Sequence, residues 1–158
     1  MKLYLVRHGE AVFSEIDQEQ SLSPSGISSV KEIAKFLKTH PIVCDVVYHS
    51  VKKRAKETAH ILLPSLGINV RCEEREGLKP NDPILPLADE LLSEREHVMI
   101  VGHLPFLSKL ASKLILADEG RPIVSFGPST LVCLSNDEGF YQIKWALSPE
   151  FFIPCAIR

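Results

Sequence analysis

The sequence has no long apolar stretch and no excess of charge of one sign. No run approaches the roughly 20 uninterrupted apolar residues that a membrane-spanning helix needs. The apolar opening from Met1 to Val6 is interrupted at once by Arg7 and His8, so we expect no signal peptide. The formal net charge is −2, which provides no general attraction to nucleic acid or to an anionic membrane. We therefore expect a cytoplasmic protein with neither nucleic acid nor membrane as a partner.

Cysteine is scarce, and neither cysteine nor histidine shows a metal-binding spacing. The four cysteines are Cys44, Cys72, Cys133 and Cys155. They form no C-x-x-C pair, and three stand in apolar, β-branched runs, which favours buried, inert thiols over a disulfide set or a metal site. No histidine belongs to a motif such as H-E-x-x-H, so the sequence predicts no metal and no other cofactor. The histidines considered as ligands are His8, His49, His60, His97 and His103.

The sequence also lacks repeats, low-complexity segments and linkers. Of its 158 residues, 45% are apolar and 24% are charged, which is typical of a globular domain with one continuous core. Long disordered stretches are not expected of this composition. We therefore expect residues 1–158 to form a single domain.

Apolar runs and amphipathic segments alternate along the chain. Buried strands are expected at residues 3–6, 43–48, 68–72 and 98–101. Helices are expected from Pro24, with Ser23 as the N-cap, to before Pro41, and over about 52–63, 82–93 and 106–116. Residues 73–83 and 117–129 are expected to be loops, and 130–134 with 141–146 a hairpin. This order predicts a three-layer α/β/α sandwich with a mostly parallel sheet and an antiparallel pair at one side.

Arginine and histidine follow three of the predicted strands, at the point where each strand ends. Arg7 and His8 follow the first strand, His49 and then Arg54 the second, and His103 the fourth. Open α/β sheets bind ligands beyond the carboxyl ends of their strands, so these residues are expected at one edge. Taken singly, each histidine is more often structural and each arginine a solvated charge. Their joint arrangement is what indicates a functional site.

Two arginines and two histidines at one edge suit the chemistry of a phosphoryl group. A guanidinium fork matches two phosphoryl oxygens at once. Phosphoryl transfer is catalysed chiefly by positioning and electrostatic stabilisation. A histidine nucleophile must be neutral to attack, and nearby guanidinium groups disfavour its protonation.

Several segments resemble motifs of the histidine phosphatase superfamily, which includes the phosphoglycerate mutases. They are Leu5–Glu10 for the R-H-G signature, Leu22–Gly26 for L-[ST]-x-x-G, Ser50–Ala59 for S-x-x-x-R-A-x-x-T-A, and Gly102–His103 for the final G-H. They occur in the family's order and cover most of the chain. The short length and residues 78–83 and 102–105 most closely resemble the SixA-type phosphohistidine phosphatases.

The resemblance implies a phosphoglycerate mutase-like fold and a covalent phosphohistidine intermediate on His8. It implies that Arg7, Arg54 and His103 hold the phosphoryl oxygens. The sequence departs from the family near the expected rim of the site. His49 stands where many members carry serine, and Gln20 stands where SixA-like chains often carry arginine. These departures bear on substrate preference rather than on the core chemistry.

The need for a general acid bears on the substrate. Larger family members place a glutamate acid in the loop before the last helix of the site, and the corresponding loop here offers Glu73, Glu74, Glu76 and Asp82. Glu76 is the candidate acid, and a solvated loop charge is the alternative. An alcohol is a poor leaving group that needs an acid, whereas imidazole leaves phosphohistidine easily. Because no general acid is clearly assigned, a substrate with a P–N bond is favoured over one with a P–O bond.

The loops of the predicted site are short, which favours an open pocket. About fifteen residues separate His8 from the first helix, and no helical cap precedes His103. An open pocket admits a histidine displayed on another protein, whereas small sugar phosphates are usually enclosed. Lys52, Lys53 and Lys56 beside Arg54 could steer an acidic partner, or form an ordinary charged helix face.

Three functions remain open at this stage. The first is a protein phosphohistidine phosphatase whose partner is a phosphorylated phosphotransfer or signalling protein. The second is a phosphomonoesterase of the same superfamily that acts on a small phosphorylated molecule. The third is a catalytically silent module that binds phosphoproteins, which would keep the arginines but would not need His8.

Overall fold

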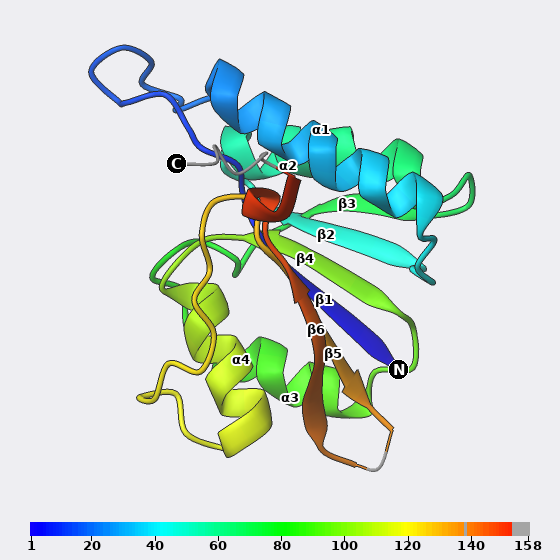
Figure 1. The fold of residues 1–158 in the computed structure, drawn as a ribbon. Coiled ribbons are helices and arrows are strands. Elements are labelled where there is room, and N and C mark those ends of the chain that lie inside the picture. Colours follow the sequence, from blue (N-terminus) through cyan, green and yellow to red (C-terminus); the bar gives the residue numbers. More distant parts are fainter. Residues whose placement is uncertain (138, 153–158) are drawn as a thin grey trace, which may run out of the picture.

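The apolar runs of the sequence form the centre of one six-stranded sheet (Figure 1). The computed structural model describes residues 1–137 and 139–152. The strands are β1 (Lys2–Arg7), β2 (Val46–Ser50), β3 (Arg71–Arg75), β4 (Val98–Gly102), β5 (Leu131–Asn136) and β6 (Tyr141–Leu147). Their order is β3-β2-β4-β1-β5-β6, with β3, β2, β4 and β1 parallel and with β5 and β6 joined antiparallel beyond β1. The predicted mostly parallel sheet with an antiparallel pair at one side is confirmed.

Helices cover both faces of the sheet, which gives the predicted three layers. The helices are α1 (Pro24–Thr39), α2 (Lys53–Leu62), α3 (Leu85–Ser93) and α4 (Phe106–Leu116), with short 3₁₀ turns η1 (Leu63–Ser65) and η2 (Pro149–Phe152). In Figure 1, α1 and α2 lie on one face of the sheet and α3 and α4 on the other. Within the described residues, none of the helices is both long enough and apolar enough to cross a membrane.

The core is divided into two parts by the sheet, because successive side chains of a strand point to opposite faces. In β1, Leu3 and Leu5 pack with α3 and α4, while Tyr4 and Val6 pack with α1 and α2. Both faces are therefore buried, which explains why this strand is an unbroken apolar run rather than an alternating one.

Strand β3 does not lie where the sequence predicted a strand. It spans Arg71–Arg75 rather than residues 68–72, so the predicted loop at 73–83 begins too early, and the Ile68 side chain is fully exposed. The reason is that β3 is an edge strand, which pairs only with β2 and needs few apolar residues. Ion pairs of Arg71 with Glu96 and of Arg75 with Glu90 stabilise it instead.

Strand β2 also begins later than predicted, at Val46 rather than at residue 43. Val43 is exposed, and the segment before the strand is held by polar contacts instead. The backbone N–H of His97 donates to the Asp45 carboxylate at 2.7 Å, and the Asp45 N–H donates to the His97 carbonyl at 2.8 Å. These paired bonds fix the start of β2 beside the start of β4.

The described cysteines are free thiols. Cys44 and Cys133 are buried as predicted, and burial raises their thiol pKa to about 12 and about 11, so neither is a reactive thiolate. Cys72 is only half-buried. Cys155 lies outside the described residues.

Helix α1 packs closely against the segment that follows β1. Ser23 caps the helix by accepting a hydrogen bond from the Gly26 N–H at 3.0 Å, and its hydroxyl donates to the Glu10 carboxylate at 2.7 Å. A Cβ at Gly26 would collide with the backbone carbonyl of Glu10. The contact leaves no room for a side chain, and it fixes the backbone two residues beyond His8.

We expect Gly26→Ala to destabilise the fold although alanine favours a helix. The backbone clash should cost in the upper part of the roughly 1–3 kcal/mol typical of overpacking, which exceeds the helix preference of about 1 kcal/mol for alanine. Urea unfolding would measure the free energy. Gly120→Ala, at an exposed loop position, is the matched control and should change it by less than about 0.5 kcal/mol. Equal effects of the two substitutions would contradict the proposed contact.

Candidate active site

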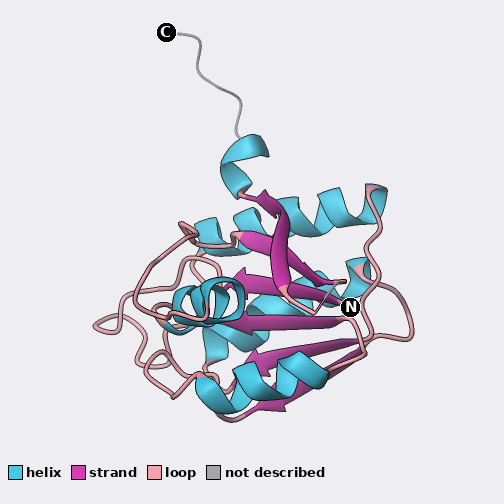
Figure 2. Cartoon of the chain, turned by 90° about the horizontal axis from the view of Figure 1, so that it is seen from below, coloured by secondary structure: helices cyan, strands magenta, loops and turns pink. Residues whose placement is uncertain are grey.

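Four predicted residues come together because β4 lies beside both β1 and β2. Arg7 ends β1 opposite Gly102 of β4, so His8 and His103 follow two neighbouring strands. The rings of these histidines lie 4.9 Å apart between centroids. Arg54 stands in the first turn of α2 and reaches His8 with its Nε atom. In Figure 2 the parallel strands point toward the edge where the long loops gather, which is where the site lies.

The hydrogen bonds of His8 determine which ring nitrogen carries the proton. Its Nδ1 lies 2.6 Å from the carbonyl oxygen of Gly9, which can only accept, so Nδ1 must donate. Its Nε2 accepts from the Arg54 Nε–H at 3.1 Å, so Nε2 must hold a lone pair. His8 is therefore a neutral imidazole whose available lone pair is on Nε2. That is the protonation state that a histidine nucleophile requires.

The electrostatics of the site favour neutral rings. Burial, aided by the charges of Arg54 and Arg7, lowers the pKa of His8 from 6.5 to about 4, although the hydrogen bond to Gly9 acts in the opposite direction. Burial also lowers the pKa of His103 to about 3, with His8 and Arg54 adding to the effect. The charges that act on both histidines are thus positive, which suits an anionic ligand.

Some buried nitrogen atoms of these residues have no hydrogen-bond partner within the described part of the chain. They are Nε of Arg7 and both ring nitrogens of His103. Leaving such groups unpaired costs free energy, so they indicate a place where a polar ligand binds. A phosphoryl group offers three acceptor oxygens, which suit the N–H groups of Arg7 and of the neutral His103 ring. The Oγ atom of Ser129 is also unpaired, but Ser129 lines a small hollow with Val6 and Thr58.

The sequence analysis missed the loop that precedes β5. Arg7 donates from Nη1 to the carbonyl of Phe126 at 2.7 Å, and the Ser129 N–H donates to the His8 carbonyl at 3.2 Å. Because β5 runs antiparallel to β1, the residues before it arrive at the edge where β1 ends. Searching only the residues that follow strands could not find them. The predicted antiparallel hairpin was the feature of the sequence that could have placed these residues at this edge.

Thr58, which lies in the Ser50–Ala59 motif, and Gln20, which precedes the Leu22–Gly26 motif, make contacts that the sequence did not reveal. Thr58 accepts the Gly9 N–H at 3.1 Å and donates to the Arg54 carbonyl at 2.7 Å, so it links the backbone after His8 to α2. Gln20 accepts from Nη1 of Arg54 at 3.1 Å, so this departure from SixA-like chains contacts a site arginine.

Glu76 does not contact the four residues. It lies just beyond the carboxyl end of β3, which β2 and β4 separate from β1. Its side chain is 76% exposed and pairs with Lys79 at 3.4 Å. The candidate acid therefore stays a prediction, at the correct edge of the sheet but without a hydrogen bond to His8 among the described residues.

His49 is not the rim residue that the sequence suggested. Its side chain is only 3% exposed and turns toward α2, where its ring lies 5.8 Å from that of His60. Cys72 of β3 lies beside both histidines. The fold thus gathers three possible metal ligands that the linear spacing did not predict.

A known protein family matches part of the chain. The model of the histidine phosphatase superfamily (branch 1) matches residues 3–79, which include Arg7, His8 and Arg54. Nearly half of the chain thus matches the histidine phosphatase superfamily. The match includes the three ordered motifs that begin at Leu5, Leu22 and Ser50.

Relatives and solved structures of the superfamily resemble the chain to different extents. A 2,3-bisphosphoglycerate-dependent phosphoglycerate mutase of Buchnera aphidicola is 37% identical over 142 residues, covering 79% of the chain and 61% of that enzyme. The same enzyme of Parvibaculum lavamentivorans is 31% identical over 86 residues, covering 51% of the chain and 41% of the enzyme. The chain thus spans less than two thirds of the length of each of these relatives. The protein histidine phosphatase SixA with tungstate matches the fold with a TM-score of 0.84 at 22% identity, covering 97% of the chain and 100% of SixA.

We expect Arg54→Gln to raise the pKa of both His8 and His103, because each loses a nearby positive charge and His8 also loses a hydrogen bond to its neutral form. Burial remains, so both values should stay below 6.5. Titration of ¹³C-labelled histidine by NMR, without ligand, measures the change. Arg75→Gln, which removes an arginine over Tyr48, is the control and should leave both values unchanged. Unchanged or lower values in Arg54→Gln would disprove this electrostatic account.

Proposed function

We propose that the chain is a phosphatase that passes a phosphoryl group from its substrate through Nε2 of His8 to water. The observation that carries this proposal is the neutral His8, whose Nε2 lone pair lies against the guanidinium of Arg54. Arg7 adjoins His8 in the sequence, and the ring of His103 lies 4.9 Å from that of His8. A nucleophile beside anion-binding donors is the arrangement that phosphoryl transfer requires.

In the first step, the Nε2 lone pair of His8 attacks phosphorus. The N–P bond forms as the bond from phosphorus to the leaving atom breaks, and the leaving atom keeps that electron pair. The His8 ring becomes positively charged, and its Nδ1–H donates the charge-assisted hydrogen bond to Gly9. Arg54 turns its donors from Nε2 to the phosphoryl oxygens, where Arg7 and His103 also bind.

In the second step, water attacks phosphorus and the N–P bond breaks. The electron pair returns to Nε2, so His8 is again neutral. The attacking water loses a proton to the solvent, and inorganic phosphate leaves. The positive surroundings that keep His8 neutral also stabilise the anion in both steps. No metal is needed in either step.

For the substrate, we propose phosphohistidine on a phosphotransfer or signalling protein. Within the described residues, no carboxylate forms a hydrogen bond or ion pair with Arg7, His8, Arg54 or His103. A leaving alcohol would require a proton from such a group, whereas imidazole departs readily. The fold shared with SixA supports the same substrate class.

A small-molecule phosphomonoesterase is the second candidate. It is favoured by the phosphoglycerate mutase relatives and by a hollow beside Arg54. The basic character of that hollow is partly neutralised, because Lys53 pairs with Glu19 at 2.7 Å and Lys56 with Glu74 at 4.0 Å. This pairing reduces the attraction of the hollow for a small, highly charged phosphate.

We expect rapid-quench experiments with ³²P-labelled substrate to trap an acid-labile, base-stable phosphoprotein. His8→Ala should abolish the trapped species and lower turnover by more than about 1000-fold, as removal of a covalent nucleophile does elsewhere. His40→Ala, which removes an exposed histidine after α1, should change neither. Unaltered turnover in His8→Ala would exclude the proposed mechanism.

We expect kcat/KM to be at least about tenfold higher for a phosphohistidine-bearing phosphotransfer protein than for sugar phosphates, because the P–N bond needs no acid. Steady-state phosphate release measures both substrate classes. A Glu76→Gln variant tests the acid in the same assay: sugar-phosphate turnover should fall only if Glu76 protonates the leaving oxygen. Faster hydrolysis of sugar phosphates by the unaltered protein would favour the second candidate.

A further inference from the structure

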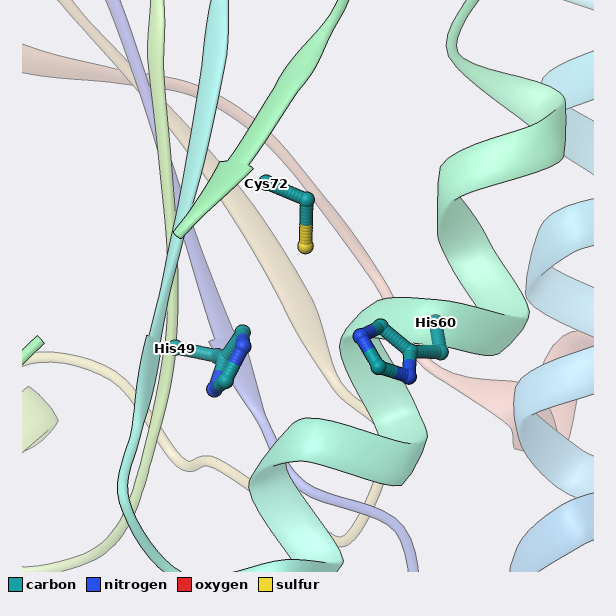
Figure 3. Close-up of side chains that lie close together, drawn as sticks. All are labelled: His49, His60 and Cys72. Atoms are coloured by element: carbon teal, nitrogen blue, oxygen red, sulfur yellow. The ribbon is translucent and has the colours of Figure 1, made fainter. Parts of the chain in front are cut away.

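Three potential metal ligands meet outside the phosphoryl site, on the face of the sheet covered by α2 (Figure 3). They are His49 of β2, His60 of α2 and Cys72 of β3. One ligand atom from each lies within 4.8 Å of the other two. Figure 3 shows both rings and the sulfur directed toward a common space between the sheet and the helix.

The register of the sheet explains the cluster. Cys72 pairs with Val47 in the β2–β3 ladder, and His49 is two residues further along β2. Alternation along strands therefore places Cys72 and His49 on the same face. Helix α2 covers that face through Ala55, Ala59 and Leu62, and His60 lies beside these contacts.

His49 is already held in a tautomer that can bind a metal. Nδ1 of His49 lies 3.0 Å from the Ser50 carbonyl, so it donates there and leaves the Nε2 lone pair free. Such a second hydrogen bond fixes the tautomer and orientation of metal-binding histidines. Cys72 is a half-buried free thiol, and His60 is an exposed residue whose side chain can adjust.

We propose that His49, His60 and Cys72 form a zinc site, with water as the fourth ligand. Two imidazoles and a thiolate are ligands that Zn²⁺ prefers, whereas Mg²⁺ and Ca²⁺ prefer oxygen. Tetrahedral Zn–N and Zn–S bonds place neighbouring ligand atoms about 3.5 Å apart. The present separations of up to 4.8 Å therefore need to close by about 1 Å, which rotation of the exposed His60 can supply.

The charges around the cluster tolerate a cation. Lys56, one turn before His60 on α2, lies 4.0 Å from the Glu74 carboxylate. Glu74 pairs with His49 in the β2–β3 ladder, so its carboxylate offsets the positive charge of Lys56 beside the proposed ligands. Binding converts the Cys72 thiol to a thiolate with release of one proton, which adds a negative charge to the site.

The proposed zinc would fasten α2 to the sheet rather than take part in phosphoryl transfer. Its ligands come from α2, β2 and β3, and none is among the four residues around the phosphoryl site. Arg54 lies on the same helix as His60. The metal would therefore stabilise the helix that carries this arginine, and it would do so whether or not the proposed phosphatase function is correct.

We expect the metal-free protein to bind one equivalent of Zn²⁺ in chelator-competition titrations, with a rise in Tm. Removing a residue that only hydrogen-bonds to a metal ligand lowers metal affinity by about 10–100-fold in other proteins. His60→Ala and Cys72→Ser each remove a ligand itself, so each should lower Zn²⁺ affinity by at least about 100-fold. His60 is exposed, so its substitution tests the site without disturbing the core. His40→Ala and Cys155→Ser are the matched controls and should bind Zn²⁺ as the unaltered protein does.

Substitution with Co²⁺ identifies the ligands directly. We expect a thiolate-to-cobalt charge-transfer band and the strong visible bands of four-coordinate Co²⁺, both lost in Cys72→Ser and retained in Cys155→Ser. His8→Ala should keep the bands, because the phosphoryl site is separate. Undiminished Zn²⁺ affinity in both His60→Ala and Cys72→Ser, no binding by the unaltered protein, or loss of the bands in His8→Ala would overturn the proposal.

Discussion

The arrangement of the site depends on one histidine ring held between an acceptor and a donor. The Gly9 carbonyl accepts a hydrogen bond from the Nδ1–H, and the guanidinium of Arg54 donates one to the lone pair of Nε2. Neither partner can exchange roles, since a carbonyl cannot donate and a guanidinium cannot accept. The neutral, correctly oriented imidazole is thus enforced by geometry, and burial, aided by the charges of Arg54 and Arg7, lowers the pKa of His8 in addition.

Much of the fold supports these two hydrogen bonds. Thr58 of α2 accepts a hydrogen bond from the Gly9 N–H. The next residue, Glu10, is held by Ser23 and Gly26 at the start of α1. The hydroxyl of Thr58 also binds the Arg54 carbonyl, so the acceptor and the donor of His8 are tied to each other through one side chain. This explains why the motif around Arg54 includes a threonine four residues later.

The sequence could predict the residues whose positions follow from one buried strand each. Arg7, His8 and His103 follow continuous apolar runs, so the chain itself indicated that they meet at one edge. It misplaced β3 because an edge strand is stabilised by ion pairs and carries no apolar signal. It missed Ser129 because an antiparallel strand brings the residues before it to that edge. It also missed the cluster at Cys72, since those ligands are neighbours only through strand register and helix packing.

The contact between Gln20 and Arg54 links the departure from SixA-like chains to the mechanism. An arginine at position 20 would repel Arg54 and present its own charge to a substrate. Glutamine instead accepts from Nη1 of Arg54 and leaves Nε directed at His8. In the proposed mechanism, Arg54 would keep that bond while its Nε moves from the His8 lone pair to a phosphoryl oxygen. Position 20 thus contacts a site arginine, and glutamine there gives this chain one charge fewer at the rim than an arginine would.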